Sequence, residues 1–243
     1  MKSTEPVVIY RCEDGIAHLT LNRPKQINAF NVQMRDELFE TLCLFQDDPN
    51  AKVGLLRGGG ERGFCAGADL TEFGTTPSQV VARSVRWERD LWGLFNELRK
   101  PLIASLHGYV IGSGIEIAAL CDIRIASDDC KFRMPEIALG MIPAAGGTQT
   151  IARLVKASNA LDIILTNRLI FSEQARKIGL VDRVVAFSEL TDKSEELAKT
   201  MAQMDSKAVA AAKRAVIEGS DLDLKVGIQL ERRMAHILES QER

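Results

Sequence analysis

The sequence predicts an α/β protein whose C-terminal part is entirely helical. Two features of the hydrophobic pattern lead to this prediction. Between residues 7 and 185, short apolar runs of strand length alternate with segments of helical period, and from residue 190 onward only the helical period remains. No internal repeat and no Pro-, Gly- or Ser-rich linker interrupts the chain. We therefore expect a core over residues 1–186 and a helical region over residues 187–243.

The first half should begin with two short strands at 7–11 and 16–21, on either side of the turn Glu13-Asp14-Gly15. Asn31 is a favourable N-cap for the helix that follows, which should run to about Gln46 because apolar residues recur there at helical spacing. The expected apolar face of this helix consists of Met34, Leu38, Leu42 and Phe45.

Beyond this helix, buried strands and helices should continue to alternate. Thr76-Pro77 offers an N-cap and a first-turn proline for a long helix to about Leu98. The other core elements are strands at 53–57, 102–106, 123–126 and 181–185, and an apolar helix at 114–120 after a loop at 108–114. The C-terminal helices are expected at 190–203, at 207–218 with Ser206 as cap, and at 222–239. The last is amphipathic, and it covers either its own core or a neighbouring subunit.

The composition argues against several classes of protein. Lys plus Arg number 31 and Asp plus Glu 33, so the net charge of −2 disfavours a strongly basic nucleic-acid binder. Aromatic residues, at 5%, are too few for a stacking surface. No segment has the pattern of a membrane span or a secretory signal. The five cysteines include no C-x-x-C pair, so we expect reduced thiols, no metal site and a cytoplasmic location.

Charge is unevenly distributed, and two long stretches hold a single acid each. Glu116 is the only charged residue between residues 101 and 121, and Glu136 is the only one between residues 134 and 152. In the chain as a whole, 26% of the residues are charged. Burial of an unpaired carboxylate is costly and favours its protonated form, so such a group can exchange protons near neutral pH. Either glutamate alone is more simply explained by solvent exposure or by an arginine partner. Two of them, each beside glycine-rich loops, favour a site.

The neighbouring loops suggest the chemistry of that site. Ala66-Gly67-Ala68 and Gly112-Ser113-Gly114 both follow expected strands, and their small side chains let a ligand approach backbone N–H groups. The second loop opens a helix, whose dipole favours negative charge. Two such N–H groups aimed at one carbonyl oxygen form an oxyanion hole. The alternative is that these glycines only permit tight turns and close packing.

Three further features are weaker. Residues 58–63 fit G-x-G-x-x-G, but no acid stands at 78–83, so a flexible surface loop is favoured over a dinucleotide site. Cys65 adjoins the first small-residue loop, yet no histidine base is evident near it, which favours a packing role. Nothing in the sequence places a nucleophile or a metal ligand beside His107.

Several ordered motifs resemble the crotonase superfamily, the enoyl-CoA hydratase/isomerase family, over residues 7–239. They are Leu21-Asn22-Arg23-Pro24 with Asn28-Ala29, Phe64-Cys65-Ala66-Gly67-Ala68-Asp69-Leu70, His107-Gly108 with Gly112-Ser113-Gly114-Ile115-Glu116, and Pro135-Glu136 with Gly140, Pro143 and Gly146-Gly147-Thr148. The resemblance implies a crotonase-like ββα spiral core. It also implies that the C-terminal helices build homotrimers, often paired into homohexamers.

The resemblance also implies a set of site residues. Members bind acyl-CoA thioesters and stabilise an enolate, with coenzyme A as part of the substrate and no other cofactor. By motif position the N–H groups of Ala66 and Ser113 would form the oxyanion hole, although the family usually has glycine at the second position. Arg23 and Lys25 would bind a phosphate group, or alternatively belong to a solvated turn. The expected CoA and substrate contacts are Lys25, Ala29, Ala68, Asp69, Leu70, Gly112 and Pro135.

Glutamates at both acidic positions imply an enoyl-CoA hydratase. Glu116 would deprotonate the water that adds at C3, and Glu136 would supply the proton to C2. An enoyl-CoA isomerase or a ring- or branch-specific hydratase is the alternative within the family, and a non-catalytic acyl-CoA or partner-binding module is the alternative outside catalysis. Met134 and Ala144 depart from the family pattern near the acyl pocket. The family pattern also extends about one helix beyond Arg243, so we expect a shortened C-terminal region.

Overall fold

The computed structural model describes residues 5–72 and 89–241, and it confirms the predicted α/β architecture with a helical C-terminal region. Its larger sheet has six strands in the order β1-β2-β3-β4-β6-β9. Only β1 and β2 are antiparallel, and every later pair is parallel. The bounds are β1 Val8–Glu13, β2 Ile16–Leu21, β3 Val53–Gly58, β4 Leu102–Leu106, β6 Ile123–Ser127 and β9 Arg183–Val185.

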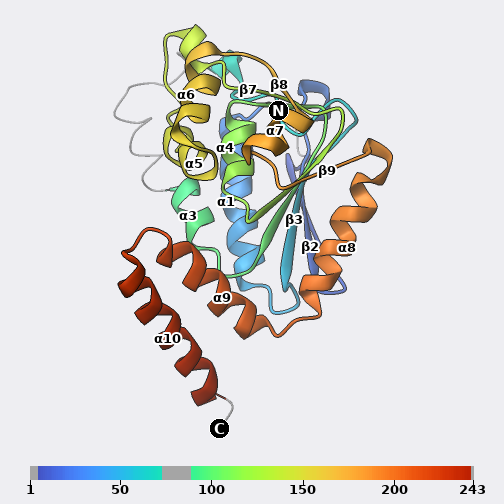
Figure 1. Cartoon of the computed structure of the whole chain (residues 1–243). Helices are drawn as coiled ribbons and strands as arrows, with labels where there is room; N and C mark the ends of the chain where they lie inside the picture. The colour runs from blue at the N-terminus through green and yellow to red at the C-terminus, as the bar shows by residue number, and fades with distance from the viewer. Residues whose placement is uncertain (1–4, 73–88, 242–243) are drawn as a thin grey trace.

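Helices cover both faces of this sheet (Figure 1). Helix α1 (Val32–Asp47) starts at the predicted cap, where the side chain of Asn31 accepts a hydrogen bond from the amide of Met34 at 2.9 Å. All four residues of its predicted apolar face are fully buried, which confirms the helical reading of that segment. Helix α8 (Leu190–Ala202) packs on the opposite face, against a separate cluster of apolar side chains that includes Val53, Leu55 and Ile103.

A second, three-stranded sheet contains β5 (Tyr109–Ile111), β7 (Lys131–Arg133) and β8 (Ile170–Phe171). Each of two consecutive turns of the chain contributes one strand to the large sheet, one to the small sheet and then a helical segment. The first of these turns is β4, β5 and α4 (Ser113–Ala119), and the second is β6, β7, η3 (Glu136–Leu139) and α5 (Gly147–Leu154). This repeating path is the expected ββα spiral.

The preceding turn of the spiral, which begins with β3, also lies alongside the small sheet. Cys65, which follows β3, forms an isolated parallel bridge with Val110 of β5. The amide of Ile111 donates to the carbonyl of Cys65 at 2.9 Å, and the amide of Gly112 donates to the carbonyl of Arg133 at 2.9 Å. The loops that follow three successive turns are therefore held side by side.

The structure corrects several predicted boundaries. The segment 108–114 is not a loop throughout, because it contains β5, and α4 begins one residue earlier than expected. The predicted helix start at Thr76-Pro77 lies outside the described residues, but one continuous helix to Leu98 is wrong. Helix α3 (Leu91–Glu97) starts afresh at residue 91, where the side chain of Asp90 caps the amide of Gly93 at 3.0 Å.

The segment between residues 134 and 180 had no sequence prediction. In addition to η3 and α5 it forms α6 (Ala157–Thr166) and α7 (Ser172–Ile178). Two more 3-10 turns, η1 (Pro24–Gln26) and η2 (Leu70–Glu72), lie in loops, and η4 (Phe187–Glu189) precedes α8.

The C-terminal helices α9 (Ser206–Gly219) and α10 (Leu224–Gln241) form a hairpin that extends away from the sheet (Figure 1). The cap of α9 is Asp205 rather than Ser206, since the Asp205 side chain accepts a bond from the amide of Ala208 at 2.7 Å. Lys213 of α9 anchors the hairpin to the core through Asp122 at 2.8 Å.

A half-buried ion pair closes the far edge of the large sheet. Asp182 accepts bonds through one oxygen from the backbone amide of Arg124 at 2.8 Å and from its guanidinium at 2.7 Å. Arg124 is buried, with 4% of its surface exposed, so the carboxylate is what compensates the cation there.

Asp182→Asn should therefore destabilise the fold, because the buried guanidinium loses its counter-charge. We expect a loss of about 2 kcal/mol and a drop in Tm of about 4–8 °C at equal protein concentration. Glu196→Gln, which breaks the exposed pair with Lys193 on α8, is the control and should leave Tm nearly unchanged. Equal shifts in thermal unfolding of the two variants would contradict this account.

Candidate active site

The buried carboxylate of Glu116 is held by backbone amides. Glu116 lies in the first turn of α4 and is 2% exposed. One of its oxygens accepts bonds from the amide of Ala145 at 3.1 Å and from that of Gly147, the first residue of α5, at 3.0 Å. Two N–H groups at a helix N-terminus stabilise negative charge on that oxygen. A side chain at Gly147 has no room, since a Cβ there would lie 2.7 Å from the same oxygen.

Glu136 lies in a contrasting environment. It is the first residue of η3 and is half-buried, and its Oε2 atom is buried with no hydrogen-bond partner among the residues that the structure describes. Burial raises the pKa of this carboxyl above its ordinary value of 4.5, and a bond to its own backbone amide offsets part of that effect. Burial therefore shifts the ionisation of Glu136 toward its protonated form, compared with an exposed glutamate.

The loop that begins α4 connects the two acids. A Cβ on Gly112 would lie 2.7 Å from Oε1 of Glu136, so the carboxyl of Glu136 lies directly against Gly112. Glu116 follows four residues later, about one helical turn along α4. The amides of Ser113 and Gly114 donate no hydrogen bond within the described ranges, as is usual for the first turn of a helix. The half-buried Ser113 thus presents an amide without a partner among the described residues, directly after Gly112, against which the carboxyl of Glu136 lies.

The loop at 65–69 lies beside it. A Cβ on Gly67 would lie 3.1 Å from the carbonyl oxygen of Ile111 and 3.8 Å from the Cα of Gly112. The amide of Ala66, however, donates to the carbonyl of Ile27 at 2.9 Å. An oxyanion-hole donor at Ala66 therefore does not fit the structure, because that amide already has a partner.

The available amide of this loop belongs to Ala68. The amide of Phe30 donates to the carbonyl of Gly67 at 2.8 Å, and the amide of Asp69 donates to the carbonyl of Phe30 at 2.9 Å. In this parallel bridge the N–H of Ala68 points away from Phe30, because the C=O and N–H of a trans peptide point in opposite directions. It donates no bond within the residues that the structure describes.

The side chain of Arg23 is neither a phosphate ligand nor a solvated turn here. Its guanidinium donates to the carbonyl of Ala29 and pairs with Asp69 at 2.9 Å, with both side chains largely buried. A hydrogen bond from the hydroxyl of Thr71 is the largest cause that lowers the pKa of Asp69, and the hydrogen bond from Arg23 lowers it further. The expected contact of Asp69 with CoA therefore does not involve a free carboxylate.

Asn28 completes this cluster. It is fully buried, adopts a left-handed φ of 54°, and its side-chain oxygen accepts a bond from the amide of Arg23 at 2.9 Å. Its amide nitrogen contacts the carbonyls of Gly59, Gly63 and Phe64 at 3.0–3.1 Å. Asn28 thus holds the glycine-rich segment 58–63 at Gly59 and Gly63, while residues 60–62 between them are exposed at the surface, as predicted.

The remaining predicted residues lie around these loops. Lys25 is exposed in η1, Leu70 is exposed at the start of η2, and Pro135 is half-buried directly before Glu136. Cys65 is fully buried, and burial raises the pKa of its thiol to about 12, which excludes an activated thiolate. His107 is buried against the carbonyl of Gly60, with its ring nitrogen at 2.9 Å.

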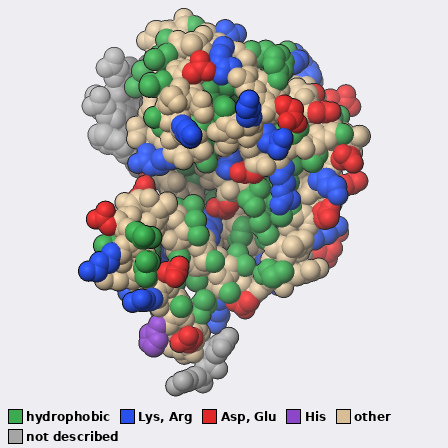
Figure 2. Space-filling model, viewed as in Figure 1, with side chains coloured by type: hydrophobic (Ala, Val, Ile, Leu, Met, Phe, Trp, Pro, Cys, Tyr) green, Lys and Arg blue, Asp and Glu red, His purple; other side chains and the backbone are tan. Residues whose placement is uncertain are grey.

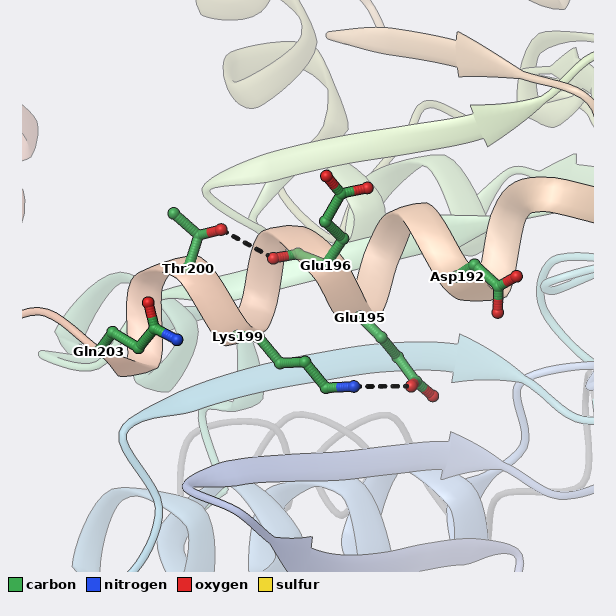
Figure 3. A pocket seen from close by; sticks show the side chains of 6 residues that line it. All are labelled: Asp192, Glu195, Glu196, Lys199, Thr200 and Gln203. Atoms are coloured by element: carbon green, nitrogen blue, oxygen red, sulfur yellow. Dashed lines mark hydrogen bonds and ion pairs between the residues drawn. The ribbon is translucent and has the colours of Figure 1, made fainter.

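A depression on α8 has a different character (Figure 3). Its side chains are those of one helix, and they include the pair Lys199–Glu195 at 3.9 Å and the bond from Thr200 to the carbonyl of Glu196 at 2.9 Å. Within the described part of the chain, no three His, Cys, Asp or Glu residues gather as a metal site. No helix in that part is long and apolar enough to cross a membrane.

The arrangement provides three chemical capacities in one place. Two amides stabilise negative charge on Glu116, burial shifts Glu136 toward its protonated form, and the amides of Ala68 and Ser113, which have no partner among the described residues, can donate to an oxyanion. Titratable groups whose environments favour opposite protonation states are typical of acid–base pairs.

Comparisons with known proteins show which family this chain resembles over most of its length. The family model described as enoyl-CoA hydratase/isomerase matches residues 11–243. A probable mitochondrial enoyl-CoA hydratase of Dictyostelium discoideum is 38% identical over 221 residues, 90% of this chain and 78% of the relative. The (E)-benzylidenesuccinyl-CoA hydratase of Thauera aromatica is 33% identical over 91% of this chain and 86% of its own length.

Among solved structures, an enoyl-CoA hydratase from Bacillus anthracis superposes with a TM-score of 0.89 at 33% identity, covering 95% of this chain and 90% of that chain. The family model alone covers far more than half of the sequence. The chain therefore belongs to the enoyl-CoA hydratase/isomerase family.

Proposed function

We propose that this chain adds water across the 2,3 double bond of a 2-trans-enoyl-CoA and releases a 3-hydroxyacyl-CoA. The observation that carries the proposal is the contrast between two glutamates at one loop. Two amides stabilise negative charge on Glu116, whereas Oε2 of Glu136 is buried with no partner in the part of the chain that the structure describes. The hydratases among its relatives support the same reaction.

In the hydration direction, Glu116 takes a proton from a water molecule whose oxygen forms the new bond to C3. The electron pair of the double bond moves to the thioester, and the charge on its oxygen is stabilised by the amides of Ala68 and Ser113. Glu136 then gives its proton to C2, which leaves Glu136 ionised and Glu116 protonated. One proton returned from Glu116 to Glu136 by way of water restores both groups, and the dehydration reaction follows the same steps in reverse.

Each glutamate should be essential in a test with crotonyl-CoA, followed by the loss of its ultraviolet enoyl absorbance. Glu116→Gln and Glu136→Gln should each lower kcat by about 10²–10⁴-fold with little change in KM, because each removes one proton transfer. Glu173→Gln, on an exposed pair of α7, is the control. If both glutamine variants retain wild-type kcat, this mechanism is excluded.

The same assay separates the competing functions. A ring- or branch-specific hydratase would act on cyclic, branched or aryl enoyl-CoA but leave crotonyl-CoA unchanged, and the Thauera aromatica relative is the specific reason to include an aryl substrate. An isomerase would move the double bond of a 3-enoyl-CoA. A non-catalytic module would bind acyl-CoA, or none, with no turnover of any of them.

Glu136→Gln should also change the dependence of stability on pH. A carboxyl with a raised pKa in the folded state favours folding most below its ordinary pKa of 4.5, and that contribution is lost as pH rises through the folded pKa. Glutamine does not titrate, so the Tm of the variant should rise relative to that of the wild type as the pH increases above about 4.5. A Tm difference that stays constant with pH would contradict the burial of an ionisable group here.

We further propose that the chain forms a homotrimer, or a homohexamer of paired trimers, through its C-terminal hairpin. Hydrophobic side chains are exposed on this hairpin (Figure 2), and among them Val216 is 67% exposed and Leu224 is 79% exposed. Apolar exposure on this scale is typical of interaction surfaces.

We also propose a cytoplasmic role in fatty-acid β-oxidation with no cofactor beyond the CoA of the substrate. The five unpaired cysteines are consistent with a reducing compartment.

Val216→Asp should shift the protein toward monomer, because a charge at an interface must be desolvated, whereas in the single chain this side chain already faces solvent. Sedimentation equilibrium should give the wild type a multiple of 26.8 kDa and the variant a smaller mass. Lys207→Asp, at an exposed polar position earlier on α9, is the control. A monomeric wild type at micromolar concentration would contradict the proposal.

A further inference from the structure

We infer that the ion pair between Arg23 and Asp69 is a positioning device that fixes the Ala68 amide against the amide of Ser113. The inference rests on the proposed function, since it takes both amides as donors to the thioester oxygen. It gives the two charged residues a role distinct from contact with CoA.

Ala68 forms no hydrogen bond with the other residues that the structure describes. It is exposed, and the bridge to Phe30 uses the carbonyl of Gly67 and the amide of Asp69 but neither polar group of Ala68. Gly67, directly before it, has a φ of 91°, a conformation that gains no restriction from a side chain. The direction of the Ala68 N–H therefore depends on how firmly its two neighbours are held.

Arg23 holds Asp69, the residue that follows Ala68. Asp69 accepts the guanidinium of Arg23 on Oδ2 at 2.9 Å, and the amide and hydroxyl of Thr71 on Oδ1 at 3.2 and 2.7 Å. The two side chains of the ion pair are 16% and 12% exposed, so solvent screens the pair little. Both carboxylate oxygens therefore accept hydrogen bonds from within the protein.

Arg23 itself is rigidly placed. Its amide is bound to Asn28 at 2.9 Å, and its guanidinium also donates to the carbonyl of Ala29, directly before Phe30. The guanidinium of Arg23 thus contacts both segments of the Phe30–Ala68 bridge, through Ala29 in one and Asp69 in the other. Lysine offers a single ammonium and cannot reproduce such a two-sided contact.

Asp69→Asn is the central test, because it keeps the shape of the side chain and removes the charge. A donor displaced by about 1 Å costs up to about 100-fold in rate, so we expect kcat to fall about 10–100-fold with KM changed less than about threefold. Arg23→Lys should give a smaller loss in the same direction. Asp182→Asn, which breaks an ion pair elsewhere, lowers Tm but should keep wild-type kcat.

A second measurement does not depend on turnover. Infrared spectra of bound butyryl-CoA labelled with ¹³C at the thioester carbonyl report the hydrogen bonds to that oxygen, which lower the stretching frequency. The wild type and Asp182→Asn should show the full downward shift and Asp69→Asn a clearly smaller one.

The outcomes are distinguishable. An unchanged kcat and an unchanged carbonyl shift in Asp69→Asn would overturn the inference, and so would a raised KM at constant kcat, which would make Asp69 a ligand contact. If the wild type turns over no enoyl-CoA but binds butyryl-CoA with a shifted carbonyl, and Asp69→Asn shows a smaller shift, the proposed function is overturned and the positioning role is supported.

Discussion

Direct backbone-to-backbone contact between successive turns of the spiral is the constraint on which the site depends. A Cβ on Gly108 would lie 2.2 Å from the carbonyl oxygen of Arg62, and one on Gly114 would lie 2.7 Å from that of Cys65. Real side chains do not fit at such distances, so only glycine lets these turns approach. The approach aligns the loops after three turns, and with them one free amide from each of two loops and a carboxyl from the third.

The chemistry then follows from unequal solvation rather than from residue type. Two identical side chains lie near one loop, but the N-terminus of α5 compensates the charge of Glu116, and nothing among the described residues compensates Oε2 of Glu136. A buried carboxyl without a partner weakens the fold when it ionises. Retention of such a group is understandable where a neutral acid is needed, and it is an example of local stability lost for function.

The sequence predicted most of the large sheet, helix α1 with its cap, and the helical C-terminal region, because these depend on local periodicity and capping. It missed the small sheet, since strands of two or three residues such as Ile170–Phe171 leave no periodic signal. It placed a donor at Ala66, since spacing alone cannot tell which of three consecutive amides is consumed by a contact with Ile27, a residue nearly forty positions away. The pairing of Arg23 with Asp69, 46 positions apart, was equally invisible.

By itself, the sequence determined the fold class, the family resemblance and the two acids, because each is written in local composition and in motif spacing. Only the tertiary structure decided which amides are free, which glutamate is stabilised as an anion, and that Arg23 serves the protein rather than a phosphate. These are properties of hydrogen-bond partners and of exclusion from water. Both arise from residues distant in the chain, so no local pattern encodes them.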